Sequence, residues 1–303
     1  MKIAKLFLSL FLLVSILIPV KAYSLDITAG VAAWYAWLYQ PYTQDVYHGT
    51  PAHSVRYGDT KHKSDLLYGP ALSVKFSDDF NLTFVFLYGK FKITEVDGGT
   101  VLSPPETYDI DYNFKRMDSD IVLNYRLNDY FKIFAGVKYL SFSTEHNFES
   151  LPWLVTPSLD DEIRGMIYEL DRSGVGPGLG LSIILPLFDN LFLISNISVF
   201  YLWTEEKKGY YSNPDYIVGS TTPLKVKTKC KDYGMNLTLS FAYYIAPIST
   251  TISVGGRGQF VRTKYDSGYK QHLHTQNNKY GDDYNTSGFY GVTLTATYSF
   301  SLN

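Results

Sequence analysis

The sequence predicts an all-β fold, a transmembrane antiparallel up-and-down barrel of about ten strands. Three observations predict it. Apolar side chains recur at every second position in many segments, the connections between these segments alternate between short and long, and the 27 tyrosines exceed what a soluble core needs. After residue 22 no apolar run is long enough to cross a bilayer as a helix, whereas a closed barrel satisfies its backbone groups inside a membrane.

Residues 1–22 are predicted to form a secretory signal peptide. Lys2 and Lys5 come before an apolar run from Leu6 to Val20, and the small residue Ala22 marks the expected cleavage site. The run is short for a transmembrane helix, which needs about 20 residues. The predicted organisation is therefore a cleaved signal peptide at 1–22 and a barrel at 23–303.

Ten alternating segments follow the signal peptide. We expect strands at residues 25–38, 64–76, 80–94, 110–126, 130–146, 174–186, 191–205, 226–245, 250–265 and 287–300. The short connections near 77–79, 127–129, 187–190 and 246–249 contain the turn formers Asp, Asn and Pro. The connections near 39–63, 95–109, 147–173, 206–225 and 266–286 are long and polar. This alternation is typical of a barrel with short periplasmic turns and long extracellular loops.

Most of these strands have one apolar face and one small or polar face. In the eighth, Met235, Leu237 and Leu239 alternate with Asn236 and Thr238. A membrane barrel points the apolar set at lipid and the other set at its lumen. A soluble β-sandwich would bury the apolar faces against each other, and it would need neither aromatic strand ends nor five long loops on one side. The pattern therefore favours the membrane barrel.

The last segment alternates in the same way and ends on Tyr298 and Phe300. Together with the signal peptide and the strand rhythm, it makes the chain resemble the bacterial outer-membrane β-barrel proteins over nearly all residues after 22. The resemblance implies export to the bacterial outer membrane, contact with its lipid, and recognition of Tyr298 and Phe300 by the barrel-assembly machinery during insertion. In that family the chain usually stops at the aromatic residue. Here Ser301, Leu302 and Asn303 follow, and we expect them to trail into the periplasm.

The faces opposite the apolar ones predict a charged lumen. The predicted lumen cluster comprises Lys75, Arg116, Asp118, Asp120, Arg126, Lys132, Lys138 and Arg257. A barrel of about eight strands is filled by its own side chains, whereas open channels belong to barrels of roughly 16–18 strands. A barrel of ten lies near the filled end, which favours mutual pairing of these charges in a narrow core. The alternative is a small charged passage, which would favour anions because bases outnumber acids in the cluster.

Alternating glycines begin the sixth predicted strand. The glycine strip Gly174, Gly176, Gly178 and Gly180 would lie on one face, taken as the lumen face. It is not a dinucleotide-binding loop, because the third glycine is not at the required spacing and no helix pattern follows. Such a strip lets another element approach closely. We expect long Arg or Lys side chains, or the 147–173 connection, to lie against it.

The chain is predicted not to be an enzyme. It resembles the omptin surface proteases, ten-stranded barrels, in strand count and loop alternation. Their rim site combines an acidic pair with an Asp-His pair. Asp109 and Asp111 match the acidic pair by position, but no Asp-x-His occurs and residues 206–225 contain no histidine. The nearest substitute is Glu145-His146, which lacks the geometry that general-base catalysis requires.

No cofactor or metal is predicted. His272 and His274 would share one strand face, but no carboxylate or cysteine lies at a firm ligand spacing. The chain has 29 acidic and 27 basic residues, which argues against a nucleic-acid partner, and its single cysteine allows no intramolecular disulfide. The predicted function is that of a non-enzymatic outer-membrane barrel, structural or surface-exposed, with a lumen largely filled by charged side chains. The first alternative is a narrow channel or transporter for small solutes or ions, and a surface protease is a distant third.

Overall fold

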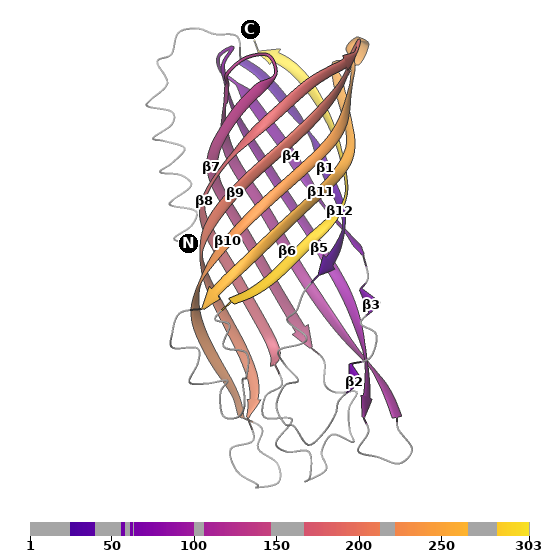
Figure 1. The fold of residues 1–303 in the computed structure, drawn as a ribbon, viewed down its shortest axis with the longest axis vertical. Helices are drawn as coiled ribbons and strands as arrows, with labels where there is room; N and C mark the ends of the chain where they lie inside the picture. The colour runs from indigo at the N-terminus through magenta and orange to yellow at the C-terminus, as the bar shows by residue number, and fades with distance from the viewer. Residues whose placement is uncertain are drawn as a thin grey trace.

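Ten long antiparallel strands close into one barrel in the computed structural model (Figure 1). It describes residues 25–39, 56–57, 61–62, 64–99, 106–146, 167–212, 222–265 and 284–302. The barrel strands are β1 (Leu25–Tyr39), β4 (Asp65–Lys75), β5 (Phe80–Gly99), β6 (Glu106–Arg126), β7 (Phe131–His146), β8 (Ile167–Phe188), β9 (Leu191–Ser212), β10 (Thr222–Ile245), β11 (Thr250–Tyr265) and β12 (Tyr284–Leu302). The two-residue strands β2 (Arg56–Tyr57) and β3 (Lys61–His62) both pair with β5. The predicted signal peptide lies outside the described residues.

The barrel is closed by pairing between distant parts of the chain. The order of the long strands is β5-β4-β1-β12-β11-β10-β9-β8-β7-β6, and β6 pairs back with β5. β1 and β12 pair from Leu25 opposite Leu302 to Tyr39 opposite Gly288. A closed ring leaves no sheet edge among its long strands, so their backbone groups are satisfied without water. In the described part of the chain, no helix is both long and apolar enough to span a bilayer.

All ten predicted strands and the predicted fold class are confirmed, but several strands are longer than predicted. β8 starts at Ile167, and β9 continues to Ser212. These additions lie at the end away from the short turns (Figure 1), where sequences such as Glu205–Ser212 are largely polar on both faces. Hydrogen bonding between strands continues there although the apolar alternation has ended.

The end of the last strand differs from expectation. Ser301 and Leu302 belong to β12, opposite Asp26 and Leu25 of β1, instead of trailing into the periplasm. The reason is register, because β1 begins early enough to offer backbone partners to both residues. Ser301 also donates from Oγ to Asp26 Oδ1 at 2.5 Å. Asn303 lies outside the described residues.

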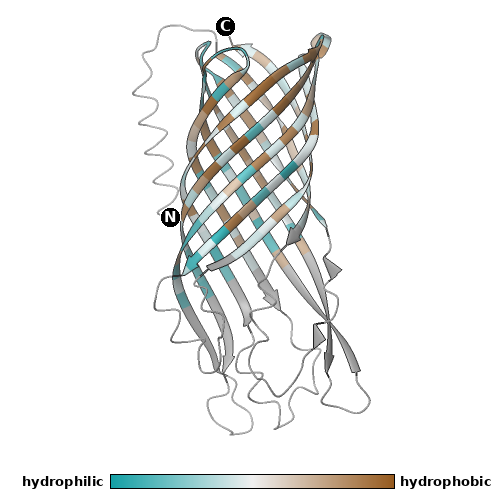
Figure 2. Ribbon diagram, in the orientation of Figure 1, coloured by the Kyte–Doolittle hydropathy of each residue, from teal (hydrophilic) through white to brown (hydrophobic). Residues whose placement is uncertain are grey.

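The outer face of the barrel is apolar. Exposed large hydrophobic side chains alternate with inward-facing ones along the strands, and hydrophobic segments recur around the wall (Figure 2). Aromatic rings gather toward the ends of this apolar band. Tyr298 and Phe300, the predicted insertion signal, are exposed near the short turns with stacked rings 6.0 Å apart. Tyr201 and Trp203 lie toward the opposite end of the band. Such a belt is typical of a barrel wall crossing a membrane.

The core of the molecule lies inside the barrel. One inward-facing group is apolar and comprises Ala32, Trp34, Ala36, Leu67, Ala71, Leu87, Phe91, Phe114, Phe142 and Phe289. It comes from β1, β4, β5, β6, β7 and β12, one side of the ring. The polar layers described below come mainly from β6 to β11, the other side. The lumen is therefore packed from both sides.

Candidate functional site

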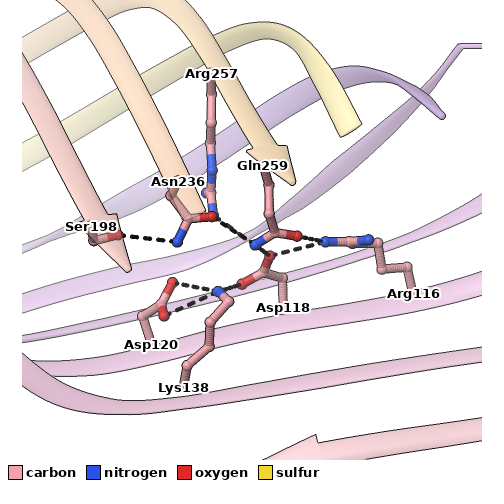
Figure 3. Close-up of polar contacts among 8 residues, drawn as sticks. All are labelled: Arg116, Asp118, Asp120, Lys138, Ser198, Asn236, Arg257 and Gln259. Atoms are coloured by element: carbon pink, nitrogen blue, oxygen red, sulfur yellow. Dashed lines mark hydrogen bonds and ion pairs between the residues drawn. The ribbon is translucent and has the colours of Figure 1, made fainter. Parts of the chain in front are cut away.

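A layer of polar side chains, several of them buried, crosses the lumen (Figure 3). We call it the central polar layer, and its members are Arg116, Asp118 and Asp120 of β6, Lys138 of β7, Ser198 of β9, Asn236 of β10, and Arg257 and Gln259 of β11. Each lies at a position where strand alternation points the side chain inward. The layer contains five of the eight residues of the predicted lumen cluster.

Asp118 is the centre of this layer. Its side chain is 1% exposed. Lys138 Nζ donates to its Oδ1 at 2.5 Å, and Arg116 Nη2 and Gln259 Nε2 donate to its Oδ2 at 3.3 and 3.0 Å. Arg257 Nη2 lies 3.5 Å from the same Oδ2. One carboxylate therefore holds three cations together, and both of its oxygens are engaged.

The contacts of Asp118 join opposite walls of the barrel. In the closed strand order β6 and β11 are five strands apart in either direction, so they face each other across the lumen. Arg116 and Asp118 of β6 nevertheless bond directly to Gln259 of β11. Gln259 then donates to Asn236 Oδ1 at 2.8 Å, and Asn236 donates to Ser198 Oγ at 3.2 Å. At this level, side chains bridge the full width of the barrel.

The central polar layer carries more positive than negative charge. Three cations, Arg116, Lys138 and Arg257, face two carboxylates, Asp118 and Asp120. Lys138 is shared, with its Nζ 3.1 Å from Asp120 Oδ1.

Aromatic faces support the same cations. Arg116 Cζ lies 3.6 Å from the ring centroid of Phe289, and Arg257 Cζ lies 4.5 Å from that of Trp34. Lys138 Nζ lies 5.3 Å from the centroid of Phe200. Cation–π contacts of this kind favour a cation that is removed from water. The contacts with Phe289 and Trp34 also join the polar layer to the apolar group on the other side of the lumen.

A second polar layer lies nearer the extracellular end. We call Arg172, Thr204, Glu206, Asp232 and Thr263 the outer polar layer. Arg172 Nη1 donates to Glu206 Oε2 at 3.2 Å, and its Nη2 donates to Asp232 Oδ1 and, at 2.5 Å, to Thr263 Oγ1. Thr204 and Thr263 donate to Asp232 at 2.6 and 2.8 Å. Among these five residues, one cation bonds to two carboxylates.

Sequence reasoning missed the outer polar layer. Arg172 and Glu206 fell in segments predicted to be loops, although both lie in strands. The signal available in the sequence was the alternation of inward-facing and outward-facing positions along each strand. Arg172 lies two residues before Gly174 on the face of the glycine strip, and Asp232 lies four residues before Asn236. Extending the predicted strand 174–186 toward its N-terminus with the same alternation would have pointed Arg172 inward, and Asp232 already lay on the inward face of the predicted strand 226–245.

The three remaining residues of the predicted lumen cluster lie apart from it. Lys75, Arg126 and Lys132 lie beside the short periplasmic turns, and Arg126 is opposite Lys132 in the β6–β7 register. Lys75 Nζ is 3.0 Å from Asp78 Oδ1, and Arg126 Nε is 3.6 Å from Asp79 Oδ1. Lys75 and Arg126 are more than 40% exposed. The predicted cluster therefore divides into two groups. One belongs to the central polar layer, and the other lies beside the short periplasmic turns, where Lys75 and Arg126 are exposed to solvent.

The glycine strip lies close to its neighbouring strands. A Cβ at Gly180 would clash with the ring of Phe134, and one at Gly174 would clash with the hydroxyl of Thr204. At Gly178 the nearest atom would be Cβ of Phe200, at 3.5 Å. The atoms nearest to these glycines thus come from the adjacent strands β7 and β9, and the expectation that long Arg or Lys side chains also lie against the strip stays a prediction. Residues 147–166 of the proposed covering connection lie outside the described residues.

The residues considered for catalysis and metal binding lie toward the extracellular rim. Asp109 and Asp111 are inside β6, which begins at Glu106. Glu145 and His146 end β7, with His146 opposite Tyr112. The structure describes the backbone of these residues only, and His272 and His274 lie outside the described residues. Within the described part of the chain, no group of three His, Cys, Asp or Glu residues is arranged to hold a metal ion.

Comparisons with known proteins find similarity in strand architecture only. No protein-family model matches the chain, and no curated protein sequence matches it. Among solved structures, it is similar to the outer membrane protease OmpT from Escherichia coli at 10% identity and a TM-score of 0.48, over 91% of this chain and 97% of that one. It is also similar to a major outer membrane protein from Thermus thermophilus (13%, TM-score 0.37, 92% and 100% of the chains) and to OprG from Pseudomonas aeruginosa (12%, TM-score 0.30, 92% and 97%). Such low values leave the function to be inferred from the chain's own residues.

Proposed function

We propose that the chain is a non-enzymatic integral protein of the bacterial outer membrane, with a structural or surface-exposed role and a lumen closed by its own charged side chains. The observation that carries this proposal is the direct bonding of Arg116 and Asp118 on β6 to Gln259 on the opposite strand β11. Side chains that meet from opposite walls narrow the lumen at that level, which supports a closed barrel.

The two polar layers favour a closed lumen over a conducting one. Both layers hold charged side chains in direct ion pairs, so an ion that passes along the lumen would have to displace these contacts. Opening the central layer would separate Asp118 from its cations inside a poorly hydrated core. Removing one partner from a buried ion pair costs about 3–5 kcal/mol, which opposes spontaneous opening.

The chemistry of the buried carboxylates also argues against catalysis. Asp118 and Asp232 accept hydrogen bonds on both oxygens from side chains of the barrel itself. A general base must instead reach a proton on its substrate. We further propose that Tyr298 and Phe300 are read by the barrel-assembly machinery, since both rings are exposed on the closing strand.

Planar-bilayer recording of the purified barrel tests this function. Silence is expected at a protein load where a known porin gives regular conductance steps. The matched variant is Gln259→Gly with Arg257→Ser, which removes the two side chains that β11 extends across the lumen, and it should conduct. Heat-modifiable migration on a gel establishes that both proteins are folded. Stable, repeated steps from the unmodified barrel would replace the proposal with a narrow channel for small solutes or ions.

A further inference from the structure

Two buried donors in the described part of the lumen have no hydrogen-bond partner. The guanidinium of Arg116 bonds through Nη2 to Asp118 and Gln259, but among the residues that the structure describes its Nε meets no acceptor. The same is true of Nε1 of Trp34 on β1. Arg116 is 3% exposed and Trp34 is fully buried. A buried donor without an acceptor destabilises the fold, so a group that accepts from both nitrogens would stabilise it.

Ring contacts make these two donors near neighbours. Arg116 Cζ lies 3.6 Å from the ring centroid of Phe289 and 6.0 Å from that of Trp34. Trp34 and Phe289 are in edge contact, with their centroids 6.2 Å apart. Arg257 Cζ lies 4.5 Å from the Trp34 ring on β1. The indole therefore lies beside two guanidinium groups, and one small acceptor can contact both unpartnered nitrogens.

The charges around these donors do not balance. The central polar layer sets the cations Arg116, Lys138 and Arg257 against the carboxylates Asp118 and Asp120. Within the described part of the chain, the ion pairs of these five residues are all with one another. One buried positive charge is left without a counter-charge, which is unfavourable in a poorly hydrated core. An acceptor that carries a single negative charge would satisfy the donors and the charge together.

Solvent contact at this layer is on its periplasmic side. Asp120 is 28% exposed and Arg257 is 13% exposed, whereas Asp118, which is farther from the short turns, is 1% exposed. Arg257 therefore joins the wetter periplasmic half of the lumen to the Trp34 ring. We expect an ion to enter from that side.

We propose that the lumen binds one small monovalent anion of the halide class, held by Nε of Arg116, Nε1 of Trp34 and the charge of Arg257. Arginine and tryptophan side chains only donate hydrogen bonds, which suits an ion that only accepts them. Sulfate and phosphate carry more charge and more acceptor oxygens than two donors among aromatic rings can compensate. The bound ion would tie β1 to β6 inside the barrel. This site does not depend on the proposed function, because a closed barrel and a narrow channel could both hold the ion.

A buried water molecule is the competing occupant of this position. Water also accepts hydrogen bonds, and buried waters commonly satisfy polar groups that have no protein partner. Water carries no net charge, however, so its binding would not depend on the excess cation or on the anion of the buffer. The two occupants are therefore distinguished by their response to salt composition and to changes of charge.

Urea unfolding in phospholipid vesicles, in sodium chloride and in sodium gluconate of equal ionic strength, tests the proposal. Above the dissociation constant, a tenfold rise in chloride should raise the folding equilibrium constant about tenfold by mass action, and gluconate should not. Trp34→Phe keeps an aromatic ring but removes the donor, so the rise should fall below about twofold. Trp37→Phe is the matched control on the same strand, because Trp37 stacks against Tyr290 on the outer wall, and it should keep the full rise. Heat-modifiable migration shows that each variant is folded.

Two charge variants separate an anion from a water molecule. Arg257→Gln removes the excess cation and should raise the chloride concentration needed for half of the effect by about tenfold or more. Asp120→Asn adds to the excess and should lower that concentration. Crystals soaked in bromide should show one anomalous peak between Arg116 and Trp34. Equal stability in chloride and gluconate, a chloride effect that Trp34→Phe leaves intact, or the absence of a bromide peak would overturn the proposal.

Discussion

Lys138 and Lys75 each hold an aspartate within hydrogen-bond distance, one inside the barrel and the other at a periplasmic turn. Lys138 Nζ is 2.5 Å from Asp118, and the two side chains are 2% and 1% exposed. Lys75 Nζ is 3.0 Å from Asp78, and those side chains are 43% and 86% exposed. The chemistry is the same, so the difference in burial decides what each pair contributes.

Burial makes the inner pair costly to break. An exposed pair is screened by water and typically contributes about 0–1 kcal/mol. A buried pair gains little over an apolar core of the same shape, but losing one partner strands an uncompensated charge. The inner pairs therefore specify how β6, β7 and β11 fit together, whereas the turn pairs can rearrange.

The two buried layers differ in how charge is shared. In the central layer one carboxylate, Asp118, serves three cations. In the outer layer one cation, Arg172, serves two carboxylates, Glu206 and Asp232. Loss of Asp118 leaves Asp120 as the remaining carboxylate of its layer, whereas Arg172 keeps Glu206 when Asp232 is neutralised. The central layer should therefore be the more sensitive of the two.

The largest effect is expected from Asp118→Asn. The substitution leaves Arg116, Lys138 and Arg257 buried with one fewer counter-charge, and we expect the free energy of unfolding to fall by about 3–5 kcal/mol. Urea unfolding of the barrel in phospholipid vesicles measures it. The double variant D118N/K138M removes a cation together with the carboxylate, so it should cost clearly less than the sum of the two single variants. Strict additivity would contradict a coupled buried pair.

Asp232→Asn is expected to cost less, about 1–3 kcal/mol. The amide keeps one oxygen to accept from Thr263, its NH2 group can donate to the hydroxyl of Thr204, and Arg172 keeps its bond to Glu206. The same urea titration measures the loss. Asp171→Asn is the control, because Asp171 is the neighbouring residue to Arg172 but its side chain is exposed. A loss as large as that of Asp118→Asn would show that sharing of charge does not distinguish the layers.

Arg257→Gln should cost about 1 kcal/mol. Arg257 is 13% exposed and lies 3.5 Å from Asp118, which keeps Lys138, Arg116 and Gln259 when it is lost. Arg126→Gln at the periplasmic mouth is the matched variant, and its effect should stay below about 0.5 kcal/mol because Arg126 is 42% exposed. The urea midpoints of the two variants measure both effects, provided that their unfolding transitions have the same slope. A larger effect at Arg126 would reverse the contrast between buried and exposed charges.

The sequence was sufficient to predict the strands of the barrel, but not the contacts among the side chains inside it. Lipid imposes strict alternation, as in Met235, Leu237 and Leu239, so the ten strands were predictable. The contacts of Asp118 with Arg257 and Gln259 depend on β6 and β11 meeting across the lumen, which no local pattern records. The alternation of residues along β11 predicts that Gln259 faces the lumen. Its hydrogen bond to Asp118 could be predicted only by knowing that β11 lies opposite β6 in the closed barrel.

The apolar part of the filling was missed for a different reason. Trp34 and Tyr35 are neighbours on β1, and both suit an apolar environment. Tyr35 is 44% exposed on the outer wall, whereas Trp34 is fully buried in the lumen. The expectation that apolar side chains face lipid therefore failed where both faces of a strand are apolar. Trp34 instead packs against Phe289 and beside Arg257, contacts that only the assembled barrel defines.

The smallest effect, and a pH-dependent one, is expected from Asp78→Asn at the periplasmic turn. The hydrogen bond and positive charge of Lys75 hold the pKa of Asp78 below its ordinary value of 3.8. A carboxyl whose pKa is lower in the folded state stabilises the fold above its unfolded pKa, and this stabilisation is lost as pH falls through the folded value. Asp78→Asn should therefore narrow the stability difference between pH 6 and pH 3 slightly, and leave the bilayer conductance unchanged. Urea midpoints at the two pH values measure the difference. Because Asp78 is in open water, a pH effect that disappears in 1 M salt is expected. A pH effect that persists in 1 M salt would contradict this, because it would show that the pair of Lys75 and Asp78 is shielded from solvent ions as the buried pairs are.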